Sequence, residues 1–332
     1  MSVLSAVSGR APARSVRSRA ETARRAAIAL LGAVGTILAS SFVIFVAMSH
    51  APGDPVAQLL GPKATDKARA DKRADLGLDD PVIVRYWDWL TGVLHGDLGT
   101  STVFRQDVTG LIGPRLETTL LLVALASALM LTVGISIGVI GGVSRRLRPV
   151  VSAIVGLGIS VPAFVAAGLL TSVFAVGLGW FPTFGAGDGL VDRIHHLVLP
   201  AIALSIGYGA YVAQLTSAAV HEESDKEHVQ TSRGRGIPQR RILRSHILTN
   251  AALPVTTASG LAVAGLVTGA VVVEQAFAID GIGSLLIKSI SSKDYAVVLA
   301  VSLIVVAVFV VMTTLIDLAQ TLLDPRQRGE MR

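Results

Sequence analysis

Six long apolar stretches organise the chain, and polar segments separate them. Each stretch runs for about 20 residues or more without a charged side chain, the length that a helix needs to cross the hydrocarbon layer of a membrane. The pattern therefore predicts an all-α integral membrane protein with about six transmembrane helices. The stretches are residues 26–48, 120–142, 150–181, 197–220, 253–273 and 296–316.

The third stretch, residues 150–181, is longer than a single crossing requires. Pro162 lies inside it and Pro182 follows its end. Proline removes a backbone donor and kinks or ends a helix, so a break is expected near residue 162. The sequence leaves open whether this stretch is one tilted helix or a span joined to a re-entrant piece.

Arginine residues gather at alternate ends of the stretches. Residues 1–25 contain six arginines and one acidic residue, and we expect a disordered basic N-terminus there. Arginines also mark residues 143–149, the segment 221–252 and the tail 324–332. Because loops rich in Lys and Arg stay in the cytoplasm, the pattern predicts an even number of spans with both termini cytoplasmic.

Residues 52–117 form a long polar segment, which we predict to be an extracytoplasmic insertion between spans one and two. Loops beyond about 60 residues cross the membrane largely regardless of their charge. Asp79 and Asp80 precede Pro81, a pattern typical of a helix start. Tyr86 and Trp89 follow at helical spacing. They indicate either a helix at the membrane interface or a small subdomain with its own core.

Small residues recur inside the predicted spans. In a membrane, small side chains let helix backbones approach closely, so these positions are predicted to be contacts between helices. The positions are Gly134, Gly138, Gly141 and Gly142 in the second stretch, and Ser259, Gly260, Gly265 and Gly269 in the fifth.

The composition excludes several kinds of chemistry. Of the 332 residues, 52% are hydrophobic and 16% are charged, whereas soluble domains carry about 25% charged residues. The chain has no cysteine and no Gly-Lys pair, so it lacks thiolate chemistry and the phosphate-binding loop of ATPases. His221-Glu222 begins like a zinc-protease motif, but Asp225 stands where the second His belongs. We therefore predict no catalytic residue, no metal site and no cofactor in this chain.

The polar segment 221–252 has the pattern of two helices joined by a turn. Its first helix is predicted over residues 224–232, with Glu222, Glu223 and other acidic residues near the start, where the helix dipole favours them. Gly236 permits a turn that residues with a Cβ resist, and Pro238 suits the first position of the next helix, residues 239–250. A partner that gripped this turn would move both adjoining spans.

Here the sequence resembles the permease subunits of binding-protein-dependent ABC importers. In their cytoplasmic loop a Glu-Ala-Ala triplet precedes a glycine and, further on, a Leu-Pro pair. Gln230, Thr231 and Ser232 occupy the triplet, Gly236 the glycine, and residues 253–254 the Leu-Pro pair. The altered triplet and the longer spacing to Leu-Pro are similar to the dipeptide, oligopeptide and nickel branch.

Further motifs resemble the first-permease type of this branch, which carries a long loop with LGLD and GDLG. The resemblance extends over about residues 26–328. The matching motifs are PGDP at 52–55, LGLDDP at 76–81, HGDLGTS at 95–101, HLVLPAIAL at 196–204, VVVEQAFAIDGIGSLL at 271–286 and LLDPRQR at 322–328.

The resemblance implies a type I ABC importer permease fold over residues 26–323, in a bacterial inner membrane. It also implies three kinds of partner: a second, similar permease, two ATP-binding subunits that hydrolyse ATP with Mg²⁺, and an extracytoplasmic solute-binding protein. Membrane lipid surrounds such a subunit, and no nucleic acid is expected. The ATPase-coupling residues would be Gln230, Thr231, Ser232, Arg233, Gly234, Arg235 and Gly236.

Three polar residues of the spans are candidates for the translocation path. Tyr211 and Gln214 lie in the fourth stretch, and Glu274 lies near the outer end of the fifth. Polar groups within a membrane are functional candidates, although helix packing uses them as well. An ion-coupled secondary transporter remains the alternative function, and an intramembrane hydrolase lacks the Ser/His or metal constellation that it needs.

Overall fold

The structure is a computed structural model that describes residues 13–50, 56, 60–61, 64–75 and 77–323. Within these residues it is a helical bundle, and its β-type pairing is one bridge between Thr100 and Asp107. The principal helices are α1 (Ala13–Ser49), α3 (Asp66–Asp75), α4 (Val82–Leu94), α5 (Val108–Val143), α6 (Arg148–Ser160), α7 (Ala163–Leu170), α8 (Leu190–Ser224), α9 (Glu227–Gly234), α10 (Gln239–Ile242), α11 (Leu248–Ala276), α12 (Ile282–Ser291) and α13 (Tyr295–Leu323).

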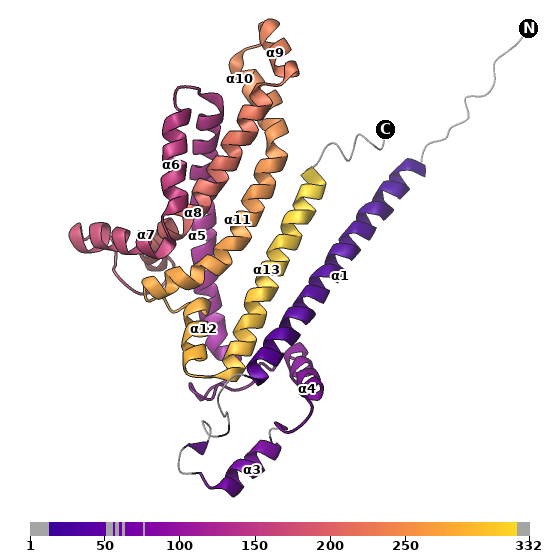
Figure 1. Cartoon of the computed structure of the whole chain (residues 1–332), viewed down its shortest axis with the longest axis vertical. Coiled ribbons are helices and arrows are strands. Elements are labelled where there is room, and N and C mark those ends of the chain that lie inside the picture. The colour runs from indigo at the N-terminus through magenta and orange to yellow at the C-terminus, as the bar shows by residue number, and fades with distance from the viewer. Residues whose placement is uncertain (1–12, 51–55, 57–59, 62–63, 76, 324–332) are drawn as a thin grey trace, which may run out of the picture.

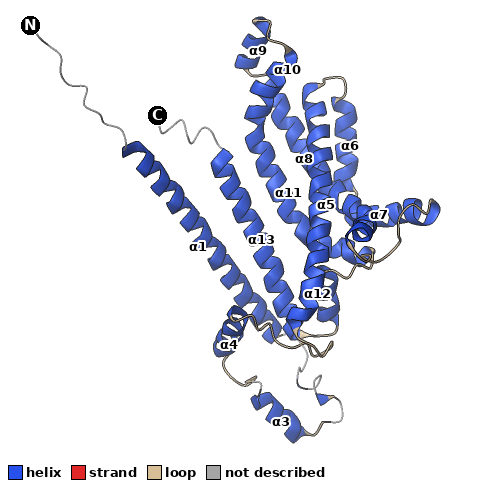
Figure 2. Ribbon diagram, turned by 180° about the vertical axis from the view of Figure 1, so that it is seen from behind, coloured by secondary structure: helices blue, strands red, loops and turns tan. Residues whose placement is uncertain are grey.

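The prediction of about six spans is confirmed. Among the described residues, five stretches are long and apolar enough to cross a membrane, and a bent helix pair makes up to six. The described start of α1, the end of α13 and the loop that holds α9 all lie at one end of the bundle (Figure 1). The opposite end carries α3, α4 and α12, as the view from behind also shows (Figure 2).

The third apolar stretch forms two helices with a sharp bend between them. Residues 148–160 and 163–177 meet at 99°. Val161 is extended, with ψ 114°, because the ring of Pro162 disfavours helical backbone in the preceding residue. The second piece continues from α7 as π-helical turns, η1 (Thr171–Gly177). The stretch is therefore not one continuous helix but a bent pair, the form of a broken span or of a span joined to a re-entrant piece.

Two predicted boundaries shift. The prediction of a disordered segment over residues 1–25 is wrong for its second half, because α1 begins at Ala13; residues 1–12 lie outside the described residues. Alanine and arginine favour helix, so α1 extends beyond the apolar span, Ala27–Ser49, into this basic stretch. Similarly, the predicted insertion 52–117 gives its last residues to α5, whose Val108 and Leu111 are buried against α12 and α13.

Helix α4 packs on the C-terminal end of α1. Tyr86 and Leu90 are buried there with Phe45, and the Tyr86 hydroxyl lies 2.9 Å from the Ser41 hydroxyl oxygen. The opposite face of α4 leaves Trp87 exposed. The aromatic residues of the insertion thus form a small core with α1, which favours the subdomain interpretation for this face.

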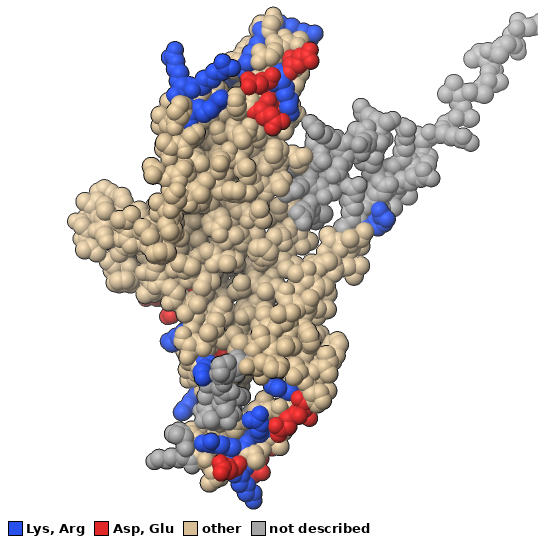
Figure 3. All heavy atoms as spheres, in the orientation of Figure 1, with Lys and Arg blue, Asp and Glu red and all other residues tan. Residues whose placement is uncertain are grey.

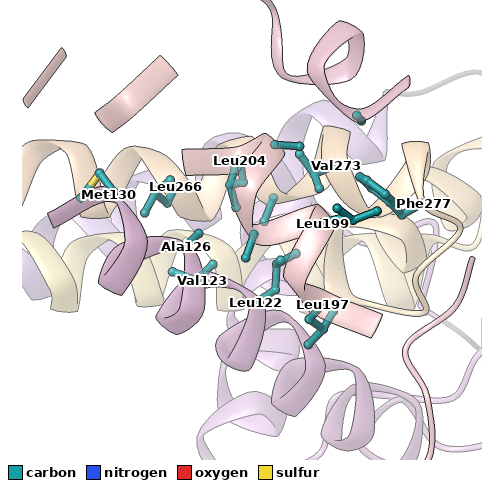
Figure 4. Close-up of a cluster of buried hydrophobic side chains, with 14 of the residues drawn as sticks. Leu122, Val123, Ala126, Met130, Leu197, Leu199, Leu204, Leu266, Val273 and Phe277 are labelled. Atoms are coloured by element: carbon teal, nitrogen blue, oxygen red, sulfur yellow. The ribbon is translucent and has the colours of Figure 1, made fainter. Parts of the chain in front are cut away.

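The main core lies between α5, α8 and α11 (Figure 4). Leu122 and Met130 of α5, Leu204 of α8 and Leu266 of α11 point into it and are almost fully buried. Three crossing helices therefore share one apolar interior. Two of them, α8 and α11, are connected by the polar loop.

Glycines set the closeness of the α5–α8 contact, as predicted. A Cβ built on Gly134 would lie 2.7 Å from the carbonyl oxygen of Gly209, and one on Gly138 would lie 2.7 Å from that of Ala213. On α11, Gly265 faces the ring of Tyr208, whose hydroxyl donates to the Gly265 carbonyl at 2.8 Å. These contacts leave no space for a side chain, which confirms the small-residue prediction at these positions.

We predict that Gly134→Leu destabilises the protein because the added side chain meets the α8 backbone. Overpacking of this kind costs about 1–3 kcal/mol. Thermal unfolding of the purified chain, followed by fluorescence-detected size exclusion, measures the effect. The matched control is Gly156→Leu on α6, where nothing lies within 4 Å of an added Cβ. Equal melting of the two variants would refute the close-packing account.

Candidate functional site

The segment between α8 and α11 projects from one end of the bundle (Figure 1). It contains α9, the short α10 and the π-helical turn η2 (Leu243–Ile247), which runs directly into α11. Lys, Arg, Asp and Glu crowd this end of the molecule, and a broad uncharged band separates it from the charged opposite end (Figure 3). The segment is therefore outside the apolar layer but continuous with two spans.

The predicted helix–turn–helix is present, with Gly236 at its centre. Helix α9 ends at Gly234, and Gly236 follows with φ +73°, a left-handed conformation. The N–H of Gly236 donates to Arg233 O at 3.0 Å and the N–H of Ile237 to Ser232 O at 3.2 Å. This pair of bonds satisfies the last carbonyls of a helix and fixes its end. Pro238 caps the next helix from one residue before its start.

The residues predicted to couple to an ATPase lie together on α9 and its turn. Six of the seven are exposed: Gln230, Thr231, Arg233, Gly234, Arg235 and Gly236. Ser232 is the exception, since it is buried and its hydroxyl donates to His228 O at 2.8 Å. The set therefore forms one contact surface with Ser232 beneath it. Its use by an ATPase stays a prediction.

A small hydrophobic cluster anchors this surface to the spans. Val229 of α9, Val220 of α8, Ile242 of α10 and Ile247 of η2 are all 0% exposed and pack together with Ala251 of α11. The cluster draws one residue or more from each helical piece of the segment. The exposed turn around Gly236 therefore lies on a buried hydrophobic cluster that extends from α8 to α11.

The three path candidates lie in different environments. A cavity of about 630 Å³ opens between α8 and α11 near their α9 ends, and Tyr211 lines it together with Leu215 and Leu261. Gln214 is exposed on α8 but does not line this cavity. Both residues remain candidates for the translocation path, and Tyr211 is the one that lines a cavity.

Glu274 occupies a buried position that ties three helices together. Its side chain is 0% exposed, and it accepts hydrogen bonds from the Thr119 hydroxyl of α5 and, at 3.0 Å, from the Ser284 N–H at the start of α12. The Thr119 oxygen accepts the Ile282 N–H at 2.9 Å. A carboxylate beside the first turn of a helix meets unpaired N–H groups and a favourable dipole. In this conformation Glu274 fastens α12, and a role in the path stays a prediction.

The sequence interpretation is wrong for Glu223. We expected it in a solvated helix start, but it belongs to the last turn of α8 and is 5% exposed. Helix α9 begins later, at Glu227, because the chain turns at Asp225 and Lys226. Charge alone gives no signal for this burial, since Glu222 beside it is exposed.

The comparisons with known proteins identify the class. Residues 131–329 match the family of binding-protein-dependent transport system inner membrane components, and residues 24–123 match the N-terminal domain of such membrane components. The chain belongs to this family and is a permease subunit of an ABC importer, whose ATPase is a separate subunit.

Relatives with this architecture carry peptide-transport names. The chain is 38% identical to a peptide permease protein of Brucella ovis, over 90% of this chain and 96% of the relative. It is 34% identical to a peptide ABC transporter permease protein of Sinorhizobium fredii over 90% of this chain and 97% of the relative. It is also 34% identical to a glutathione transport system permease protein of Salmonella choleraesuis, again over 90% and 97%.

Solved structures share the fold. An inward-facing conformation of the MetNI methionine ABC transporter contains a chain that superimposes with a TM-score of 0.54 at 19% identity, covering 62% of this chain and 93% of that one. A second crystal form gives a TM-score of 0.52 with 68% and 97% coverage. The predicted ABC importer permease fold is therefore confirmed.

We predict that Gly236→Ala loosens the end of α9, because a residue with a Cβ resists φ +73°. The strain is about 1 kcal/mol. Faster tryptic cleavage after Arg233 and Arg235 in the folded protein would report it. The control is Gly234→Ala, which lies in helical backbone with open space around its Cβ. If Gly234→Ala accelerates cleavage as much as Gly236→Ala does, the capping account is wrong.

Proposed function

We propose that this permease forms half of the passage of a peptide importer and that Gln230–Gly236 receive the push of an ATPase. The observation that carries the coupling proposal is the exposed turn on a buried base shared by α8 and α11. The names of the relatives support peptides as the substrate class. The loop would face the cytoplasm, where ATP is available, with both termini on the same side.

The family shows that such a permease works with an ATPase and a binding protein. We propose in addition a second, similar permease and two ATP-binding subunits, which hold ATP and Mg²⁺ between them. Broad apolar surface on α8 and α11 supports the second permease: Leu215, Leu253 and Leu261 are exposed beside the 630 Å³ cavity. Facing copies of this hollow would enclose a route between two permeases.

The proposed mechanism is alternating access by rocking of packed helices. Closure of the ATPase pair moves the turn around Gly236. Because η2 joins the loop to α11 without a break, and α8 ends three residues before α9, the movement tilts both spans. The hollow lined by Tyr211 narrows at the loop end as the opposite end opens to receive substrate. An ion-coupled secondary transporter would need no contact with an ATPase. Tests for that contact and for ATP dependence therefore distinguish the two functions.

Thiol chemistry tests the coupling surface directly, because the chain has no cysteine of its own. We predict that Thr231→Cys cross-links to an ATPase subunit in membranes, since Thr231 is exposed on α9. Immunoblotting of the cross-linked product identifies the neighbour. Thr65→Cys, exposed just before α3 at the opposite end, is the control and should give no such product. Labelling of residue 231 by a membrane-impermeant maleimide from outside intact cells would overturn the orientation.

Energy dependence separates the two transport classes. We predict that liposomes containing the complete complex and its binding protein take up labelled di- and tripeptides only when ATP is supplied to the ATPase side. Collapse of the proton and sodium gradients should leave that uptake unchanged. Uptake by the purified permease alone, driven by an ion gradient, would instead establish a secondary transporter.

A further inference from the structure

Glu223 is the one buried carboxylate of the loop. The segment 221–252 contains four acidic residues, and the structure describes all of them; the other three are exposed, whereas Glu223 is 5% exposed. Burying an ionised carboxylate is costly unless it is paired and hydrogen-bonded. Its position at the end of α8 therefore depends on the groups around it.

Three groups from different parts of the loop converge on this carboxylate. The Lys226 ammonium, in the turn before α9, donates to Oε2. The Asn250 side-chain amide of α11 donates to Oε1 at 2.9 Å. The ring Nε2 of His228 on α9 lies 3.2 Å from the same oxygen. Asn250 is itself held, because its amide also donates to His246 O at 2.8 Å.

The hydrogen bonds to Glu223 add a directional constraint that the hydrophobic cluster does not provide. Apolar contact is non-directional, so the cluster around Val229 and Ile247 resists separation more than it resists sliding or rotation. Hydrogen bonds to an ionised group are strong and directional. Glu223 therefore fixes the rotation of α9 and α11 relative to the end of α8, at the level where a push on the turn enters the spans.

We propose that Glu223 is the joint that makes α8, α9 and α11 move as one body, a positioning residue for coupling. This inference rests on the proposed function, because it assigns the residue that transmits a push received at Gln230–Gly236. Its link to Asn250 carries the motion into α11, and its links to Lys226 and His228 carry it from α9. Losing the Asn250 link should let α11 lag behind the turn.

The test reverses the hydrogen bond between Glu223 and Asn250. In Glu223→Gln the joint loses its charge, and in Asn250→Asp two carboxylates face each other. In the double variant, the new amide at position 223 donates to the new carboxylate at position 250, which restores that bond and the net negative charge, although a carboxylate at position 250 no longer donates to His246 O. The assembled complex in liposomes gives peptide taken up per ATP hydrolysed, with labelled di- and tripeptides as the probe. Each single variant should lower this ratio roughly three- to tenfold, and the double variant should recover part of the loss.

A second readout needs no substrate. Spin labels at Arg235→Cys and Leu253→Cys report the distance between the turn and α11, and both positions are exposed. We expect a narrow distance distribution in the otherwise native complex, a broader one in each single variant, and a narrow one again in the double variant. The matched control is Glu227→Gln, an exposed carboxylate at the start of α9. It should change neither readout.

The outcomes distinguish the proposed role of Glu223 as the joint from the proposed coupling role of the loop. If the native complex lacks ATP-driven uptake, the proposed function fails, while the distance distributions still decide whether Glu223 holds the helices together. If the native complex transports and the single variants keep both its ratio and its narrow distribution, the joint is refuted and the coupling surface stands. Reduced assembly or a lower melting temperature with an unchanged ratio would assign Glu223 to stability alone.

Discussion

Close packing without hydrophobic drive is the constraint on which this structure depends. Inside a membrane, apolar side chains gain little by leaving lipid for protein, so helices hold together through van der Waals fit and hydrogen bonds. Here α5 meets α8 through Gly134 and Gly138, where backbone lies against backbone, and α11 meets α8 through Gly265 beneath Tyr208. Contacts this close have little freedom to adjust. The three helices consequently form a stiff unit on which a loop can act.

The loop between α8 and α11 is built to keep that stiffness up to its exposed tip. A fixed helix end at Gly236, a dry cluster around Val229 and a buried carboxylate at Glu223 hold it in place. The residues proposed to meet a partner, Ser232 apart, are among those that face the solvent. A flexible loop would absorb a push, whereas the loop proposed here would pass it into two spans.

The sequence predicted the span number and the helix–turn–helix because both depend on local pattern. Uncharged runs of membrane length and a glycine before a proline are readable signals. The sharp bend at Pro162 was expected as a break, but its 99° angle depends on neighbouring helices. Helix α12 is not among the predicted elements, since its ten residues, Ile282–Ser291, are too few for a crossing.

Two buried acidic residues show what the sequence pattern does not predict. Glu274 and Glu223 are both enclosed by partners distant along the chain, Thr119 and Asn250 respectively. Sequence spacing carries no information about such contacts. Glu274 is recognisable as unusual because it borders an apolar run, whereas Glu223 is hidden within a charged segment. Burial of a charge is a tertiary property, and only the fold reveals it.

The central claim is that the loop and the spans α8 and α11 move as one rigid lever. Electron cryomicroscopy of the assembled complex, without nucleotide and with an ATP analogue, tests it most directly. The account predicts that residues 190–276 of this chain superimpose in the two states, with Gln230–Gly236 seated on an ATPase, while the whole unit rotates relative to its partners. A loop that changes shape while α8 and α11 stay in place would contradict it.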